Sequence, residues 1–276
     1  LFKFAFIKRF LMFSIVIPIF NEAQNIKSLV YEIFNSLKDY NNFEVIIVND
    51  FSSDNTTDIL NTLKKKLNIS LINNPKNKGQ SFSIHKGVLK SKNNTIITID
   101  GDGQNNPIDI IKLLQIYFSK KEISLVGGIR VKRKDSLIKI ISSKIANNIR
   151  MIVLKDGCVD TGCSLKVFDK EVFMNFPFFK GIHRFLPALF IASKCEVKYI
   201  NVDHRPRTAG KSKYGTLGRL FVRYNSIDFE GSLMKCNGKI TKIITANSKK
   251  IIDCDVWIEN TEGVKTTTGT ATFKLK

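Results

Sequence analysis

The sequence predicts an α/β protein whose mostly parallel sheet is covered by helices on both faces, with a short antiparallel β appendage at the C-terminus. Strand and helix patterns alternate along the first half of the chain, which is typical of a parallel sheet. The strands are nearly continuous apolar runs, as burial on both faces requires. The chain has 276 residues, of which 43% are hydrophobic, so it is long enough to bury a large core.

The first strand is predicted over Ser14–Ile19, where apolar residues are almost uninterrupted. A helix follows, because apolar residues recur at helical spacing at Ile26, Leu29, Val30, Ile33, Phe34 and Leu37. The pattern repeats, with strands over Phe43–Val48, Ile69–Ile72, Thr95–Ile99 and Ile123–Val126 and helices over Asn55–Leu67, Gly79–Leu89 and Pro107–Phe118. Because such sheets bind ligands at the carboxyl ends of their strands, the residues that follow each strand are the functional candidates.

Acidic side chains follow three of these strands. They are Glu22, Asp50 and the pair Asp100 and Asp102, while Asn73–Asn74 follows a fourth strand. Carboxylates that converge on one sheet edge repel each other unless a cation or hydrogen-bond donors lie between them. Taken alone, Glu22 or Asp50 is equally well explained as a helix cap or turn former.

The segment Asp100–Gln104 is the most specific indication of a functional site in the sequence. Two carboxylates two residues apart, in a glycine-containing turn, supply hard oxygen ligands suited to Mg²⁺ or Mn²⁺ bridging a diphosphate. The alternative is a solvated turn that caps the helix beginning near Pro107. No P-loop and no G-x-G-x-x-G motif occurs, so neither explains this edge.

The chain carries 44 Lys and Arg against 24 Asp and Glu, a net charge of +20. Lys greatly outnumbers Arg, which disfavours base-reading nucleic-acid binding and favours anionic membranes or phosphates as partners. Five cysteines without a C-x-x-C pair indicate reduced thiols in a cytoplasm-like compartment and no zinc site. No apolar run reaches the ~18–20 residues of a membrane span, so membrane contact is expected to be peripheral.

Residues 1–11 are apolar but interrupted by Lys and Arg, without a signal-peptide cleavage site. Because Met12 stands directly before the first strand, residues 1–11 are predicted to lie upstream of the natural start as a non-native extension. The predicted domains are then residues 12–222 and a β-rich fragment at residues 223–276.

Three motifs carry a resemblance: Ser14–Glu22, Val48–Thr56 and Asp100–Gln104, in this order and spacing. Together they resemble the family-2 glycosyltransferases with the Rossmann-like GT-A fold over residues 12–222. The later segments Asp160–Lys166, Gly181–Pro187 and His204–Tyr214 resemble the dolichol- and polyprenyl-phosphate glycosyltransferases of the dolichol-phosphate-mannose synthase type.

The resemblance implies an inverting enzyme that moves a sugar from a UDP- or GDP-linked donor to a polyprenyl or dolichyl phosphate at the cytoplasmic face of the membrane. Asp50 would hydrogen-bond the base or ribose of the donor, and Pro18 and Glu22 would shape the same pocket. The metal would be held by Asp100, Asp102 and Gln104. It would neutralise the charge that builds up on the departing nucleoside diphosphate.

A lipid phosphate is already largely ionised at neutral pH, so positioning matters more than a general base. Arg130 and Arg133 are the candidates for binding it, because a guanidinium contacts two oxygens at once; a solvated basic loop is the alternative for Arg133. In the loop after His204, Arg207 and Lys211 would cover the donor diphosphate, unless the loop is only a charged surface. Asp160 either orients the sugar or caps a turn.

Two further segments leave alternatives open. Ser136–Leu154 has the pattern of a basic amphipathic helix, which suits either the bilayer interface or the core. Near the C-terminus, Ile252–Glu259 alternates apolar and polar residues and Asn260–Gly263 then turns into Val264–Leu275. Gly231–Leu275 resembles the last strands of MaoC-type hot-dog dehydratases without their catalytic region, so an interaction appendage or a fusion artefact is expected there.

Two other functions remain open at this point. Transfer to a glycan hydroxyl would need a carboxylate base, for which Asp160 is the candidate. The second is that of a catalytically impaired protein, which binds nucleotide sugars or lipid phosphates without turnover.

Overall fold

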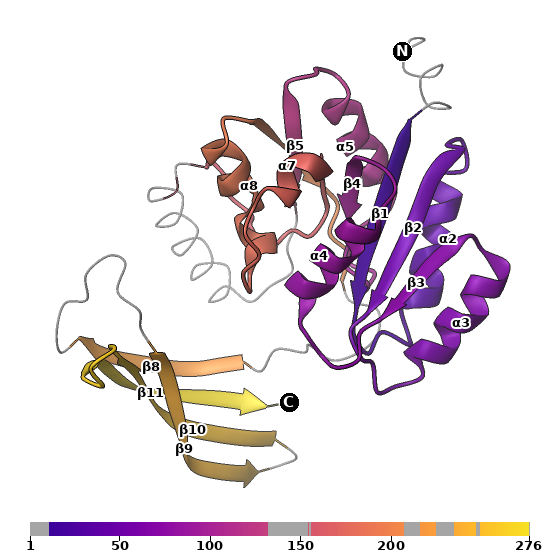
Figure 1. Cartoon of the computed structure of the whole chain (residues 1–276). Coiled ribbons are helices and arrows are strands. Elements are labelled where there is room, and N and C mark those ends of the chain that lie inside the picture. Colours follow the sequence, from indigo (N-terminus) through magenta and orange to yellow (C-terminus); the bar gives the residue numbers. More distant parts are fainter. Residues whose placement is uncertain are drawn as a thin grey trace. The chain divides into compact units, whose positions relative to one another are not determined.

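The computed structural model describes residues 11–131, 154, 156–206, 216–224, 235–246 and 249–275. It divides into two compact units, Leu1–Gly210 and Lys211–Lys276, and each is described by itself (Figure 1). The domain limits inferred from the sequence, at residues 12 and 222, stay predictions.

The first unit alternates strands and helices as the apolar periodicity predicted (Figure 1). Its elements up to the fifth strand are β1 (Met12–Ile19), α2 (Ile26–Ser36), β2 (Asn42–Asn49), α3 (Thr56–Lys66), β3 (Ile69–Asn73), α4 (Gln80–Lys90), β4 (Thr95–Thr98), α5 (Asp109–Tyr117) and β5 (Ile123–Arg130). They are followed by β6 (Lys166–Asp169), α7 (Lys170–Met174), α8 (Ile182–Ala192) and β7 (Glu196–Val202).

These strands form one seven-stranded sheet in the order β3-β2-β1-β4-β6-β5-β7. Its pairs are parallel except that β6 runs antiparallel to both β4 and β5. The chain moves from β1 outward to β2 and β3 and then returns to place β4 on the other side of β1. The strand order therefore reverses between β1 and β4, and sheets of this kind bind ligands outside the carboxyl ends of the strands at such a reversal.

Successive residues of β1 supply the cores on the two faces of the sheet, as a buried strand does. Ile15 and Ile17 pack in the larger core with residues of α2, α3 and α5, while Val16 packs with residues of α4, α7 and α8. Helix α4 approaches β1 closely because it has Gly87 at the contact. A Cβ atom on Gly87 would lie 2.4 Å from Cγ1 of Val16.

Strand β5 is longer than predicted. The sequence pattern ended this strand at Val126 and began a loop at Gly128, whereas β5 continues to Arg130 and pairs with β7. Gly128 is needed within the strand, because a Cβ there would lie 2.9 Å from both the Cys163 sulfur and Cγ2 of Val202. The glycines mark a crowded strand rather than a loop, and this moves Arg130 to the end of a strand.

The second unit is a four-stranded antiparallel sheet in the order β8-β11-β10-β9 (Figure 1). Its strands are β8 (Thr216–Tyr224), β9 (Lys235–Ala246), β10 (Lys249–Glu259) and β11 (Lys265–Leu275). The predicted turn between β10 and β11 is confirmed: Asn260 N donates to Val264 O at 3.0 Å, and Gly263 has a φ of 77°. The hot-dog resemblance of this region stays a prediction.

Among the helices in the parts of the chain that the structure describes, none is long and apolar enough to cross a bilayer.

Candidate active site at the carboxyl edge of the sheet

Four neighbouring strand ends carry the candidate residues to one edge of the first sheet. Backbone hydrogen bonds tie the ends together: Asp50 N donates to Ile19 O, and Asn74 N donates to Asn49 O, both at 2.8 Å. The carboxyl ends of β1, β2 and β3 therefore lie side by side, with β4 pairing on the other side of β1. This is the juxtaposition that the sequence predicted for a parallel sheet.

Asp50 is buried and organises the loop that leads into α4. Its Oδ1 accepts hydrogen bonds from Lys78 N and Asn74 Nδ2, both at 2.8 Å, and its Oδ2 accepts one from Gly79 N at 2.7 Å. Gly79 has a φ of 87°, which favours glycine. A carboxylate has about four acceptor positions, so these three bonds leave Asp50 one for a ligand.

Glu22 is also buried and orders the start of α2. Its carboxylate accepts a hydrogen bond from Asn25 Nδ2 at 2.8 Å, and its backbone N donates to Thr56 Oγ1 at 2.9 Å. Pro18, the third residue expected around the nucleotide, lies in β1 opposite Val48 of β2. Pro18 and Glu22 thus flank the end of β1, next to the end of β2.

The Asp100–Gln104 turn follows β4 and packs against the end of β1. A Cβ on Gly101 would lie 2.4 Å from Cγ2 of Ile19, so the turn depends on this glycine. Asp102 Oδ1 accepts a hydrogen bond from Gln104 N at 3.2 Å, and Gln104 Nε2 donates to Arg205 O at 3.3 Å. The turn is therefore held by its own bonds and by the chain after β7.

Asp100 is the electrostatically perturbed member of the pair. Burial, the largest cause, and the nearby charge of Asp102 raise the pKa of Asp100 to about 6, although a hydrogen bond from Ser164 and the charges of Lys166 and Arg130 act in the opposite direction. Two carboxylates that repel each other in this way provide a place where a cation is favoured.

The donor set fits a divalent cation of the Mg²⁺ type. Such ions take one or two protein carboxylates and complete their shell with water and substrate phosphates. Within the described ranges, no group of three or more His, Cys, Asp or Glu side chains could hold a metal by itself. The pair Asp100 and Asp102 therefore suits an ion shared with a ligand rather than a closed structural site.

Arg130 and Asp160 form a mostly buried ion pair beside this turn. Arg130 Nε donates to Asp160 Oδ2 at 2.8 Å and Arg130 Nη2 donates to Asp160 Oδ1 at 2.7 Å, while Arg130 N donates to Oδ2 at 3.1 Å. Burial by itself lowers the pKa of Arg130, but the bonds and charge of Asp160 outweigh it and raise that pKa. One edge of the guanidinium is thus occupied, and Asp160 does more than cap a turn.

Two residues at this edge were missed by the sequence reasoning. Gln80, the first residue of α4, donates from Nε2 to Asp100 Oδ1 at 2.7 Å. Lys166 is only 3% exposed, donates to Cys163 O, and lowers the pKa of Asp100. Lys166 ends a segment that carried the family resemblance, but nothing in the local pattern marked Gln80 beyond its position after a strand end.

His183 is held against α4. Its Nδ1 lies 2.8 Å from Ser81 Oγ, which also accepts a hydrogen bond from Gly181 N at 2.9 Å. Burial, followed by the charges of Lys166 and Arg184, lowers the pKa of His183 to about 4. His183 is therefore neutral near pH 7.

Arg205 of the basic loop lies beside the Asp100–Gln104 turn, where its backbone N donates to Gln104 O at 2.8 Å. Its guanidinium donates to Glu32 Oε2 at 2.6 Å and to Asn106 Oδ1 at 2.8 Å. Arg133, Arg207 and Lys211 lie outside the described residues, as does the predicted helix Ser136–Leu154 apart from Leu154.

The sequence is similar to a known protein family and to characterised relatives. The profile of glycosyl transferase family 2 matches residues 14–176. Dodecaprenyl-phosphate galacturonate synthase from Rhizobium johnstonii is 32% identical over 210 residues, which are 73% of this chain and 61% of that protein. Undecaprenyl-phosphate 4-deoxy-4-formamido-L-arabinose transferase from Yersinia pestis is 28% identical over 218 residues, 78% of this chain and 66% of that protein. The chain spans about three fifths to two thirds of the length of these curated relatives.

Solved structures agree on the fold. Mannosyl-3-phosphoglycerate synthase from Rubrobacter xylanophilus has a TM-score of 0.60 at 15% identity, covering 71% of this chain and 68% of that chain. Glucosyl-3-phosphoglycerate synthase from Mycobacterium tuberculosis, solved with Mn²⁺, UDP and glucosyl-3-phosphoglycerate, has a TM-score of 0.56 at 17% identity and covers 74% of each chain. These similarities confirm the predicted α/β fold of the GT-A type.

Proposed function

Because the chain belongs to glycosyl transferase family 2, we propose that it transfers a sugar from a nucleotide sugar to a polyprenyl phosphate. The observation that supports this proposal is that the Asp100–Asp102 pair lies next to the Arg130–Asp160 ion pair. We assign the diphosphate to the first pair and the acceptor phosphate to Arg130 of the second. The relatives named as dodecaprenyl- and undecaprenyl-phosphate enzymes support a lipid phosphate as the acceptor.

On the donor side, we assign the base or ribose to the remaining acceptor position of Asp50, in a pocket shaped by Pro18 and Glu22. The hydrogen bonds from Lys78 N and Gly79 N hold the Asp50 carboxylate in one orientation, so the nucleotide meets a pre-organised acceptor. Arg207 and Lys211 are proposed to contact the donor diphosphate on the strength of their sequence position.

For the diphosphate we propose Mg²⁺ or Mn²⁺ held by Asp100 and Asp102 with the amide oxygen of Gln104. When bound, the ion supplies positive charge that stabilises the leaving nucleoside diphosphate. The glucosyl-3-phosphoglycerate synthase structure contains Mn²⁺ and UDP, which supports a divalent ion in this fold. Gln80 donates a hydrogen bond to Asp100, and the charge of Lys166 favours the ionised form of Asp100.

On the acceptor side, Asp160 orients Arg130 and the rest of its guanidinium binds the lipid phosphate. The second pKa of a phosphate monoester is about 6, so a phosphate oxygen is already a competent nucleophile at neutral pH. It attacks the anomeric carbon opposite the leaving diphosphate, which inverts the configuration. Arg133 is proposed as a second contact to the same phosphate.

A lipid acceptor requires that the site reach a membrane surface. We propose that the protein works peripherally at the cytoplasmic face, where its net charge of +20 attracts anionic headgroups.

Incubation with labelled nucleotide sugars, Mn²⁺ and undecaprenyl or dolichyl phosphate tests the function. Label in a lipid-linked product is expected, and none when the lipid lacks its phosphate. Label found only on added glycans would show that a hydroxyl is the acceptor. Binding of the donor without turnover on either acceptor would show a binding protein.

A further inference from the structure

An exposed aromatic surface lies beside the candidate active site. Three phenylalanines are open to solvent in the segment that leads from α7 into α8: Phe178 is 45%, Phe179 38% and Phe185 38% exposed. The ring centres of Phe179 and Phe185 are 5.8 Å apart. Single exposed apolar residues are ordinary, but a contiguous group of them marks an interaction surface. We call these three residues the phenylalanine patch.

Helix α4 holds the patch in place from one side. The ring of Phe178 contacts those of Phe82 and His85 in α4, edge to face, with centres 6.1 and 5.2 Å apart. Phe178 is thus anchored at one edge of its ring and exposed at the other. The patch is therefore a packed part of the first unit.

The same contact places the patch close to the strand ends. Gly181, which lies between Phe179 and Phe185 in sequence, donates from its backbone N to Ser81 Oγ of α4 at 2.9 Å. Gln80, the residue before Ser81, donates to Asp100 Oδ1 at 2.7 Å. A membrane that meets the patch would therefore bring its headgroups close to the candidate active site.

The segments that build this surface are basic. They are residues 75–85 and 175–185, which contain no Asp or Glu. Their exposed basic residues are Lys76, Lys78, Lys180 and Arg184. Lys78 Nζ lies 5.0 Å from the centre of the Phe82 ring, so this charge is next to the aromatic contacts. Exposed phenylalanines among lysines and arginines are typical of surfaces that enter the interface of an anionic bilayer.

We propose that the phenylalanine patch is the surface by which the protein docks on an anionic lipid bilayer. The phenyl rings enter the headgroup region, and the basic residues beside them meet the anionic headgroups. This inference rests on the proposed function for the reason that a membrane is needed. A second copy of the chain fits less well, because a two-fold contact would bring the same basic residues against each other.

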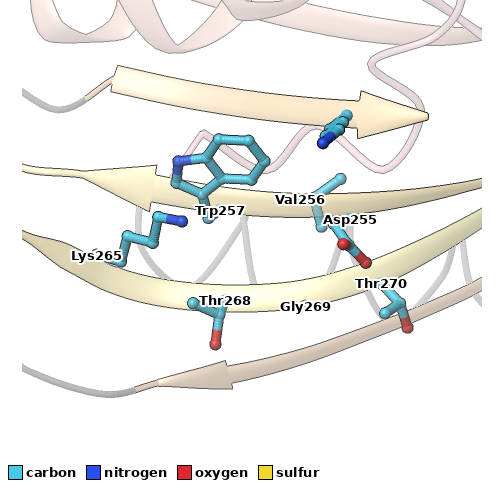
Figure 2. A pocket seen from close by; sticks show the side chains of 8 residues that line it. Asp255, Val256, Trp257, Lys265, Thr268, Gly269 and Thr270 are labelled. Atoms are coloured by element: carbon cyan, nitrogen blue, oxygen red, sulfur yellow. The ribbon is translucent and has the colours of Figure 1, made fainter. Parts of the chain in front are cut away.

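The second unit carries a different kind of surface. Trp257, Asp255, Lys239 and Lys265 line a shallow cavity of about 490 Å³ on its sheet (Figure 2). Lys239 is paired across the strands with Asp255, and Trp257 Nε1 donates to Glu259 Oε1 at 2.6 Å. Carboxylates accompany the lysines there, so this surface attracts anionic headgroups less than the phenylalanine patch does.

Binding of the full chain to vesicles of equimolar phosphatidylglycerol and phosphatidylcholine tests the proposal. The wild type should sediment with the vesicles. Phe179→Glu should lower the partition coefficient about tenfold or more, because a phenyl ring leaves the interface and a carboxylate meets anionic headgroups.

The matched control is Phe118→Glu. Phe118 is 37% exposed and is followed by Lys120 and Lys121, so its surroundings are similar. It lies at the end of α5, which leads into the start of β5 at the opposite edge of the sheet. Phe118→Glu should therefore bind within about twofold of the wild type.

A tryptophan at the same two positions gives a direct readout. With brominated acyl chains in the vesicles, the emission of Phe179→Trp should be quenched more than that of Phe118→Trp. The native tryptophan, Trp257, is the only one in the chain and contributes equally to both. If Phe179→Glu loses its circular dichroism at the helical band, this comparison takes the place of the glutamate variants.

Three results would overturn the proposal. They are a wild type that does not bind these vesicles, equal losses of binding in Phe179→Glu and Phe118→Glu, and equal quenching of the two tryptophan variants. Dissociation of a dimer by Phe179→Glu, seen by light scattering with vesicle binding unchanged, would assign the patch to a second copy instead. Vesicle binding is measured without a nucleotide sugar, so its failure is distinguishable from failure of the proposed transfer reaction.

Discussion

Removing Asp160 should destabilise the first unit through an unpaired guanidinium. The Arg130 and Asp160 side chains are only 15% and 6% exposed, and three hydrogen bonds join the two residues. Breaking a buried ion pair on one side costs about 3–5 kcal/mol. Because Arg130 retains some solvent contact, the lower half of that range applies, and we expect Asp160→Ala to lower the free energy of unfolding by about 3 kcal/mol.

The assay is urea unfolding followed by circular dichroism at the helical band, since the helices among the described residues all lie in the first unit. Asp160→Asn should lose less, about 1–2 kcal/mol, because an amide oxygen still accepts one bond from Arg130. The double variant Arg130→Met with Asp160→Leu should recover most of the loss, since neither charge is then buried alone. A loss below about 0.5 kcal/mol in Asp160→Ala, as for surface ion pairs, would refute the view that Asp160 holds a buried guanidinium in place.

The other predictions concern the site and the packing beneath it. Asp102→Asn should lower kcat at least about 100-fold at saturating Mn²⁺. An unchanged kcat in this variant would contradict the assignment of Asp102 as a metal ligand. Arg130→Ala should raise the KM for lipid phosphate far more than the KM for the nucleotide sugar; an equal rise in both would contradict the acceptor site. The pKa of His183 is lowered in the folded state to about 4, so His183 protonates first in the unfolded chain and stability falls as the pH drops from 6.5 to about 4, by up to about 3 kcal/mol. His183→Asn should flatten this part of the stability curve, and an unchanged curve would count against a buried neutral imidazole. Gly87→Ala should cost about 1–3 kcal/mol in urea unfolding, because its Cβ would collide with Val16; an unaffected midpoint would show that α4 can move away from β1.

Local periodicity was enough to locate the first five strands of the first unit and the residues that follow β1 to β4, but it did not predict β6 and β7. The alternation of apolar strands and helices placed Asp50 and Asp100 at strand ends, and in a parallel sheet those ends meet at one edge. The structure adds that the Asp50 carboxylate accepts three hydrogen bonds from its own chain. No local pattern predicts this, because Asn74, Lys78 and Gly79 reach Asp50 only after the loop has folded back.

The sequence by itself therefore determined the fold class, the acidic strand ends and the alternation of apolar and polar residues along Ile252–Glu259, since these follow from the order of residue types along short segments. Tertiary structure decided what depends on long-range pairing. It inserted antiparallel β6 between β4 and β5, joined Arg130 to Asp160, and set Gln80 against Asp100. Such contacts bring together residues twenty or thirty positions apart, and the energy that selects them comes from burial and charge compensation in the assembled sheet, which short segments do not yet possess.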